Sequence, residues 1–125
     1  MNPEVGERAQ RLIDPVVLDR IQSEVNSDPV VLFMHGSPVF PQCSGSAQAV
    51  QILGMLGVHY KSIDVLTDPS LRLAIKDFSD WPTLPQLYVM GKFIGGNDVM
   101  RQMLENGELQ DLFAQLAIPM NGDHL

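Results

Sequence analysis

The chain has 125 residues, of which 45% are hydrophobic and 18% are charged, a composition typical of one globular domain. Its formal net charge of −7 argues against general nucleic-acid binding, because that activity needs a basic face. We expect a cytoplasmic protein that does not cross a membrane, because no secretory signal or long apolar run is visible and a single cysteine forms no internal disulfide.

The first predicted elements are a lead-in, a helix and a strand. Residues 1–14 are mixed and polar, so we expect a flexible lead-in. A helix should begin at Pro15, because Asp14 suits the N-cap and proline suits the first helical position. Turn residues at 26–29 end this helix. The apolar run over 30–34 then predicts a strand buried on both faces.

A second helix and a second strand should follow the loop over 35–42, which contains two prolines. The helix is predicted from about Cys43 to Met55, with three residues facing inward: Ala47, Val50 and Leu53. Alternating apolar and polar residues over 58–65 predict the second strand.

The second half of the chain predicts a further helix, a β-hairpin and two short helices. In chain order these are a helix beginning at Asp68–Pro69, a stiff turn over 81–85, a hairpin over 86–94 turning at Gly91–Lys92, a helix entered through 95–98 and ending near Glu105, a helix over 108–116, and a tail over 118–125. This order implies a mixed sheet flanked by helices. Ligands of open α/β sheets tend to bind beyond the strand ends, so the expected crevice contains Cys43.

Cys43 is the only cysteine, and the residues alone leave three roles open: redox nucleophile, metal ligand, or small buried side chain without chemistry. A thiol at a helix N-terminus faces unpaired N–H groups and the positive end of the dipole, which favour the thiolate. Ser46 stands where a dithiol enzyme has its second cysteine. Any disulfide exchange would therefore stop at a mixed disulfide and await an external thiol.

Metal binding is limited by the same cysteine count. A [2Fe–2S] cluster generally needs four thiolates, or two thiolates with two histidines. The chain offers Cys43 and three histidines without ligand-like spacing, namely His35, His59 and His124. A cluster would need two chains and a small-molecule thiol bound beside each Cys43.

Three segments of the chain resemble the monothiol glutaredoxins: VVLFMHGSP…FPQCSGSAQAVQIL, DWPTLPQLYVMGKFIGGND and ENGELQDL. The resemblance covers about residues 15–117, which would form the glutaredoxin domain. It implies an α/β, thioredoxin-like fold with a mixed four-stranded sheet flanked by helices, and it implies glutathione binding. It further implies a [2Fe–2S] cluster shared between two subunits, cluster transfer to iron–sulfur acceptor proteins, and a homodimer or a heterodimer with a BolA-type protein.

The resemblance also implies a set of site residues. Cys43 would be both the reactive cysteine and the cluster ligand. Glutathione would be held by the Leu84 backbone beside a cis Pro85, by Asn97 and Asp98 at the γ-glutamyl end, and by Arg72 at the glycine carboxylate. Apart from the resemblance, Asp98 also fits a helix N-cap and Arg72 a solvated surface charge.

The sequence departs from the family pattern at two places in this site. Ser44 and Gly45 replace the family's Gly-Phe pair, which predicts a looser, wetter site that holds a cluster less firmly. His35 replaces the family lysine that contacts glutathione. It would donate to a ligand carboxylate, stabilise the Cys43 thiolate when protonated, or ligate metal, and we expect a weaker glutathione affinity that improves as pH falls.

Three functions fit the sequence. The first is a monothiol glutaredoxin that carries a [2Fe–2S] cluster. The second is a glutathione-dependent thiol-disulfide oxidoreductase, possessing weak activity, that removes glutathione from proteins by a monothiol route. The third is a degenerate partner-binding module that keeps the fold without the chemistry.

Overall fold

The computed structural model describes residues 12–120, so most of the predicted lead-in at 1–14 and the last five residues of the predicted tail at 118–125 lie outside the described residues. The elements, in chain order, are α2 (Pro15–Val25), β1 (Val30–Met34), α3 (Ser44–Leu56), β2 (Lys61–Asp64), the 3-10 helix η1 (Val65–Thr67), α4 (Pro69–Ser79), β3 (Gln86–Val89), β4 (Lys92–Gly95), α5 (Asn97–Glu105) and α6 (Glu108–Gln115). No helix within the described range combines the length and apolarity that a bilayer span requires.

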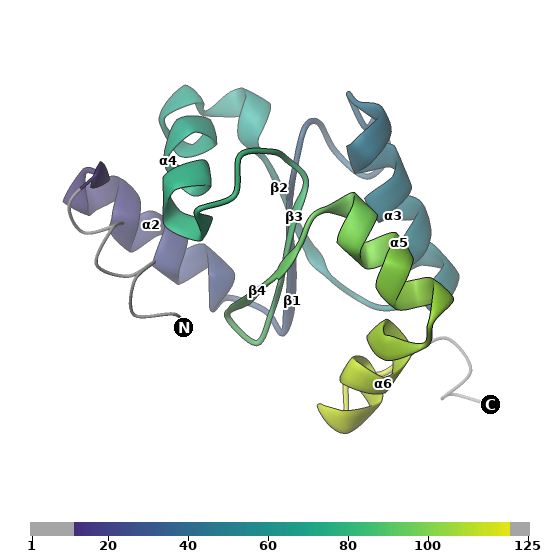
Figure 1. Ribbon diagram of the computed structural model, residues 1–125. Coiled ribbons are helices and arrows are strands. Elements are labelled where there is room, and N and C mark those ends of the chain that lie inside the picture. The colour runs from purple at the N-terminus through teal and green to yellow at the C-terminus, as the bar shows by residue number, and fades with distance from the viewer. Residues whose placement is uncertain (1–11, 121–125) are drawn as a thin grey trace.

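The four strands form one mixed sheet in the order β2-β1-β3-β4 (Figure 1). Strand β1 pairs with β2 in parallel and with β3 antiparallel, and β3 pairs with β4 antiparallel. All five residues of β1 are buried, which confirms the prediction from the continuous apolar run over 30–34. The predicted mixed four-stranded sheet flanked by helices is therefore confirmed.

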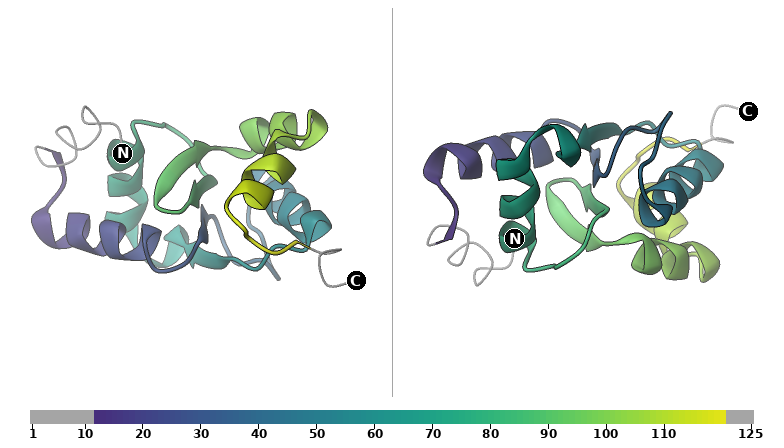
Figure 2. Two further views of the ribbon diagram at one scale, coloured as in Figure 1. Left: turned by 90° about the horizontal axis from the view of Figure 1, so that it is seen from below. Right: turned by 90° about the horizontal axis from the view of Figure 1, so that it is seen from above.

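Helices cover both faces of the sheet and create two separate hydrophobic cores. Helices α2 and α4 pack on one face with inward residues such as Phe33 and Tyr88. Helices α3, α5 and α6 pack on the other face with residues such as Leu32 and Leu87. Two further views show these two groups of helices on opposite sides of the sheet (Figure 2). Ile118 belongs to the second core, although it lies in the predicted tail.

Helix starts follow the local signals in the sequence. The Asp14 carboxylate accepts a hydrogen bond from Val16 N at 2.9 Å, and Pro15 is the first helical residue of α2, as predicted. The same pattern recurs at α4, where Asp68 accepts from Leu71 N at 3.2 Å. Short-range capping chemistry therefore explains where these two helices begin.

The second strand is shorter than the predicted 58–65. It ends at Asp64, whose carboxylate accepts hydrogen bonds from Gly36 N at 3.0 Å and Leu66 N at 2.9 Å. These bonds turn the chain into the 3-10 helix η1, because the carboxylate caps it. The prediction treated the alternation as one strand and missed this cap.

The hairpin turn also lies one residue earlier than predicted. Met90 and Gly91 connect β3 to β4, and both have positive φ angles, 52° and 79°. Two consecutive left-handed residues form the type of turn that matches the twist of a hairpin. Lys92 is consequently the first residue of β4 instead of a turn residue.

The inward face of α3 differs from the prediction. Ala47 is exposed, so the prediction that it faces inward is wrong. Val50 is only partly buried. The buried face instead consists of Ser46, Ala49, Ile52 and Leu53. Ser46 turns inward because its hydroxyl accepts a hydrogen bond from the backbone N–H of His35 at 3.0 Å, which sets the rotation of the first turn.

Candidate functional site

Cys43 is the N-cap residue of α3, directly after the loop that follows β1. Its backbone is extended, with φ −150°, and its Sγ accepts a hydrogen bond from Ser46 N at 3.3 Å. The Ser46 hydroxyl lies 3.2 Å from the same sulfur. Cys43 is a free, half-buried cysteine. A partly accessible sulfur that receives helix N-terminal donors is arranged to act as a nucleophile or ligand, because both roles use the thiolate.

His35 lies beside the thiol, with its Nδ1 3.3 Å from the Sγ of Cys43. The loop that carries both residues is closed by a backbone hydrogen bond from Gln42 N to His35 O at 2.9 Å. Burial lowers the pKa of His35 below its ordinary value, and the nearby cations of Lys76 and Arg72 lower it further, while Asp64 opposes them. The neutral imidazole therefore prevails near pH 7, and its Nδ1–H tautomer can donate to a thiolate.

Gly45 occupies a crowded position in the first turn of α3. A Cβ built there would lie 2.9 Å from Asn97 Oδ1 and 3.1 Å from Pro85 Cδ. The space that a side chain at position 45 would need is therefore filled by α5 and by the proline loop. The prediction of a looser, wetter site does not describe the packing around Gly45.

The loop over 81–85 ends in a cis peptide bond between Leu84 and Pro85, in agreement with the resemblance. Within residues 12–120, no backbone–backbone hydrogen bond uses Leu84, so its N–H and C=O remain available to a ligand. Leu84 is 8% exposed as a whole residue, so access to these backbone groups is narrow. An extended peptide could add to this backbone in the manner of an added strand.

The side chain of Gln86 forms hydrogen bonds with the backbone of this loop. It is fully buried, and its Nε2 donates to Trp81 O and Thr83 O, both at 3.2 Å. Its Oε1 accepts from the Tyr88 hydroxyl at 3.0 Å. Burial raises the pKa of Tyr88, so the hydroxyl keeps the proton that it donates.

The N-terminus of α5 faces the same region. Gly96 is its N-cap residue and makes no side-chain cap, so the first N–H groups of the helix have no side-chain acceptor from the N-cap. The Asn97 side chain donates from Nδ2 to Gln48 Oε1 at 2.8 Å, which joins α5 to α3. Asp98 is exposed, with its carboxylate 3.9 Å from Arg101. Uncapped N–H groups suit an anion, while the Asp98 carboxylate suits a cation.

Arg72 and Lys76 lie one turn apart on α4, and both are partly buried. Both cations lower the pKa of His35, the residue beside the thiol. Sequence reasoning identified Arg72 but missed Lys76, although the i,i+4 spacing gives both side chains the same helix face. Two further residues were missed, Ser46 as a contact of the thiol and Gln48 as the partner of Asn97.

The arrangement provides few metal ligands. Within residues 12–120 no group of three or more His, Cys, Asp or Glu side chains could hold a metal ion. Cys43 is a thiolate donor at a partly open position, which fits one corner of a cluster whose other ligands come from outside the chain.

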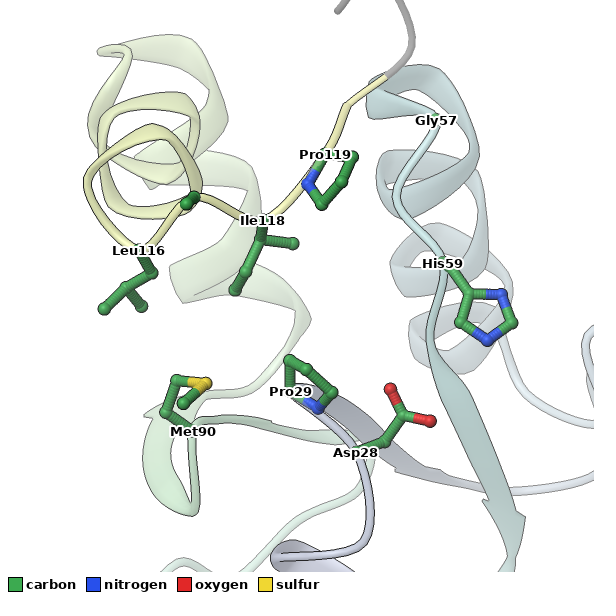
Figure 3. A pocket seen from close by; sticks show the side chains of 9 residues that line it. Asp28, Pro29, Gly57, His59, Met90, Leu116, Ile118 and Pro119 are labelled. Carbon is green, nitrogen blue, oxygen red and sulfur yellow. The ribbon is translucent and has the colours of Figure 1, made fainter. Parts of the chain in front are cut away.

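A cavity of about 410 Å³ (Figure 3) lies elsewhere in the molecule. Its wall includes Pro29, His59, Met90, Leu116 and Ile118. Met90 N donates to Pro29 O at 2.8 Å, just before β1 begins, whereas Cys43 follows the end of that strand. The cavity is therefore not part of the thiol site.

Comparison with known proteins points to one family. Residues 30–94 match the family described as Glutaredoxin. "Monothiol glutaredoxin-5, mitochondrial" of Saccharomyces cerevisiae is 49% identical over 104 residues, which cover 79% of this chain and 69% of that relative. The solution structure of a monomeric truncated mutant of 1-C-Grx1 from Trypanosoma brucei has a TM-score of 0.76 at 37% identity, covering 82% of this chain and 94% of that chain.

A buckwheat glutaredoxin–glutathione complex provides a more distant likeness. It has a TM-score of 0.73 at 22% identity, covering 90% of this chain and 96% of that chain. At that identity the likeness concerns the fold alone. The neighbours are glutaredoxins, so the predicted thioredoxin-like fold is confirmed.

Proposed function

This chain belongs to the monothiol glutaredoxins of the glutaredoxin family, and we propose that it binds glutathione and carries a [2Fe–2S] cluster between two subunits for transfer to acceptor proteins. The observation that carries the proposal is the geometry of Cys43. Its sulfur is partly open, accepts from Ser46 N at 3.3 Å, and has no second cysteine with which to form a disulfide. A second thiol must therefore come from a small molecule or another chain.

The groups around Cys43 match the chemistry of glutathione. The cations of Arg72 and Lys76 suit its glycine carboxylate, since both lie near the thiol site on one face of α4. The free backbone of Leu84 suits its peptide groups. A buckwheat glutaredoxin of the same fold has been solved as a glutathione complex.

The γ-glutamyl end of glutathione carries both a carboxylate and an ammonium group. The uncapped N–H groups at the start of α5 would bind the carboxylate, and Asp98 would bind the ammonium. The Asn97 side chain has a different role in this proposal, because its amide already donates to Gln48. Its contribution to the ligand would come from the backbone.

The number of sulfur ligands that a [2Fe–2S] cluster needs then accounts for the proposed dimer. Each subunit would supply the Cys43 thiolate and one bound glutathione thiolate, so two subunits complete four sulfur ligands. The N–H group of Ser46 and the imidazole of His35 would donate to the protein sulfur when it serves as a ligand. We propose a homodimer, or a heterodimer with a BolA-type protein, acting in the cytoplasm.

A thiol-disulfide oxidoreductase is the second candidate, and the 3.3 Å contact between His35 and Cys43 favours it. The Cys43 thiolate would attack the glutathione sulfur of a protein–glutathione disulfide, and the protein thiolate would leave and take up a proton. A second glutathione thiolate would then attack the Cys43–glutathione disulfide. This step would release glutathione disulfide and restore the Cys43 thiolate.

Anaerobic reconstitution with iron, sulfide and glutathione tests the proposal. We expect a visible absorption band in a dimer, dependent on glutathione and absent from Cys43→Ser, whose serine still suits an N-cap and keeps the fold. A colourless monomer with rapid glutathione–disulfide exchange would favour the oxidoreductase. If neither signal appeared, the partner-binding module would be the better account.

A further inference from the structure

Gly45 and Asn97 are interlocked across the interface between α3 and α5. A Cβ at position 45 would lie 2.9 Å from Oδ1 and 3.3 Å from Cγ of Asn97. Real Cβ atoms do not approach other atoms to less than 3.0 Å, so any side chain at position 45 would displace the Asn97 amide. The glycine that departs from the family pattern is therefore the residue that leaves room for Asn97.

The Asn97 amide is also held on its other side. Its Nδ2 donates to Gln48 Oε1 at 2.8 Å, and both side chains are half-buried. This hydrogen bond joins α5 to α3, and apolar residues of both helices pack together in the second core. The amide thus links two helices whose N-termini both face the thiol site.

The N-termini of α3 and α5 would bind two different parts of the same glutathione molecule. The α3 N-terminus holds the Cys43 sulfur, and the α5 N-terminus presents uncapped N–H groups to the γ-glutamyl carboxylate. One glutathione molecule must reach both, so its affinity depends on the distance between them. A shift of α5 against α3 would misplace one of the two contacts even where each helix remains folded.

We infer that Asn97 is a positioning residue of the glutathione site, that it acts through Gln48, and that Gly45 is required to admit its amide. This inference rests on the proposed glutathione binding. It assigns Asn97 a role through the second helix instead of a side-chain contact with the ligand. It also explains why the Ser44–Gly45 pair need not loosen the site, because the amide fills the space beside Gly45.

Glutathione binding to the apo protein, measured by titration calorimetry, tests the positioning role. Asn97→Ala and Gln48→Ala should each raise the Kd roughly fivefold, the factor that corresponds to the loss of one neutral hydrogen bond. Gln48→Glu keeps an acceptor for Nδ2, and at high salt, where its added charge is screened, it should restore most of the affinity that Gln48→Ala loses. The alkylation rate of Cys43 should stay unchanged in Asn97→Ala and Gln48→Ala, because their effect is on ligand placement and not on the thiol.

Equilibrium unfolding tests the interlock without any ligand. Gly45→Ala should lower the urea midpoint, whereas Gly54→Ala in the same helix should raise it, because no atom lies within 4 Å of a Cβ at position 54. In an Asn97→Ala background the penalty of Gly45→Ala should shrink, since the displaced amide is gone. The contact with Pro85 Cδ at 3.1 Å remains, so part of the penalty persists.

The outcomes of these experiments distinguish failure of the positioning role of Asn97 from failure of the proposed glutathione binding. If wild-type protein binds glutathione but Asn97→Ala and Gln48→Ala bind it equally well, the positioning role is overturned and the proposed function stands. Equal penalties of Gly45→Ala with and without Asn97 would overturn the interlock. If wild-type protein binds no glutathione, the proposed function and the positioning role both fail, while the unfolding cycle still decides whether Gly45 and Asn97 interlock.

Discussion

The Nδ1 atom of His35 and the Sγ atom of Cys43 lie 3.3 Å apart at the start of α3. The backbone N–H of His35 donates to the Ser46 hydroxyl at 3.0 Å, which links the His35 main chain to the helix turn that also donates to the sulfur. The thiol, the imidazole and the first helical turn therefore form one connected unit. A change in any member of this unit should alter the others.

The pH dependence of stability should reveal His35. Its pKa is lowered in the folded protein from an ordinary value of 6.5, mainly by burial and then by Lys76 and Arg72, against the opposing charge of Asp64. The unfolded chain therefore binds the proton more tightly, so the stabilising contribution is present above pH 6.5 and is lost as pH falls below it. The urea midpoint of the wild-type protein should therefore decrease as the pH is lowered below 6.5.

His35→Gln is the control for that measurement. It removes the group but leaves His59 and His124 in place, so the difference between the two proteins isolates His35. The variant should lose less stability on acidification than the wild type. Parallel curves for the two proteins would contradict the assignment.

Lys76 should influence both His35 and the ligand. Lys76→Met removes a cation that lowers the pKa of His35, so this pKa should rise, as followed by the NMR chemical shift of the imidazole. Glutathione affinity should fall, and the loss should be smaller at high salt because screening already weakens the wild-type interaction. Lys92→Met is the matched control, since Lys92 is exposed on β4 and does not contribute to the His35 shift. Equal titration of His35 in both variants would refute the placement of the Lys76 charge.

Gln86 should be required for stability as well as for the shape of the Leu84–Pro85 loop. Gln86→Leu removes the donor to the part-buried carbonyls of Trp81 and Thr83 and the side-chain acceptor of the buried Tyr88 hydroxyl. We expect a loss of roughly 1–3 kcal/mol in unfolding free energy, the cost of unsatisfied buried polar groups. Urea denaturation measures the loss. A change in unfolding free energy smaller than the uncertainty of that method would argue against a stabilising role for the Gln86 hydrogen bonds.

Local signals in the sequence predicted much of the fold. Asp14 and Pro15 marked a helix start, and the apolar run over 30–34 marked a buried strand, because both effects depend on neighbouring residues only. The inward face of α3 was mispredicted at Ala47 because the phase of that helix is set by the hydrogen bond from His35 to Ser46. Apolar periodicity carries no information about such a bond.

Several residues of the candidate site were predictable from the sequence, but the contacts that join them across α3 and α5 were not. Cys43 was predicted from the residues themselves, whereas Arg72 and the cis Pro85 were predicted from the family resemblance. The link between Gln48 and Asn97 joins residues 49 positions apart, so it depends on how α3 and α5 pack. Gly45 was interpreted as a loss of packing because its neighbours across that interface were unknown.

Met90→Asn should stabilise the protein without affecting the thiol site. Met90 has a φ of 52° and is 55% exposed at the hairpin turn, where asparagine tolerates the left-handed backbone better. We expect a gain of roughly 0.5–1 kcal/mol in unfolding free energy, a fraction of the ~1–2 kcal/mol that left-handed backbone costs most residues. Glutathione affinity should not change, because Met90 lies beside Pro29, at the opposite end of β1 from Cys43.

The same substitution at Met55 separates turn geometry from the loss of an exposed methionine. Met55 is 65% exposed in α3, where the backbone is right-handed and asparagine is the poorer helix former. Met55→Asn should therefore lower the urea midpoint while Met90→Asn raises it. If both variants moved the midpoint the same way, exchange of an exposed apolar side chain would explain the result, and the left-handed strain at Met90 would not.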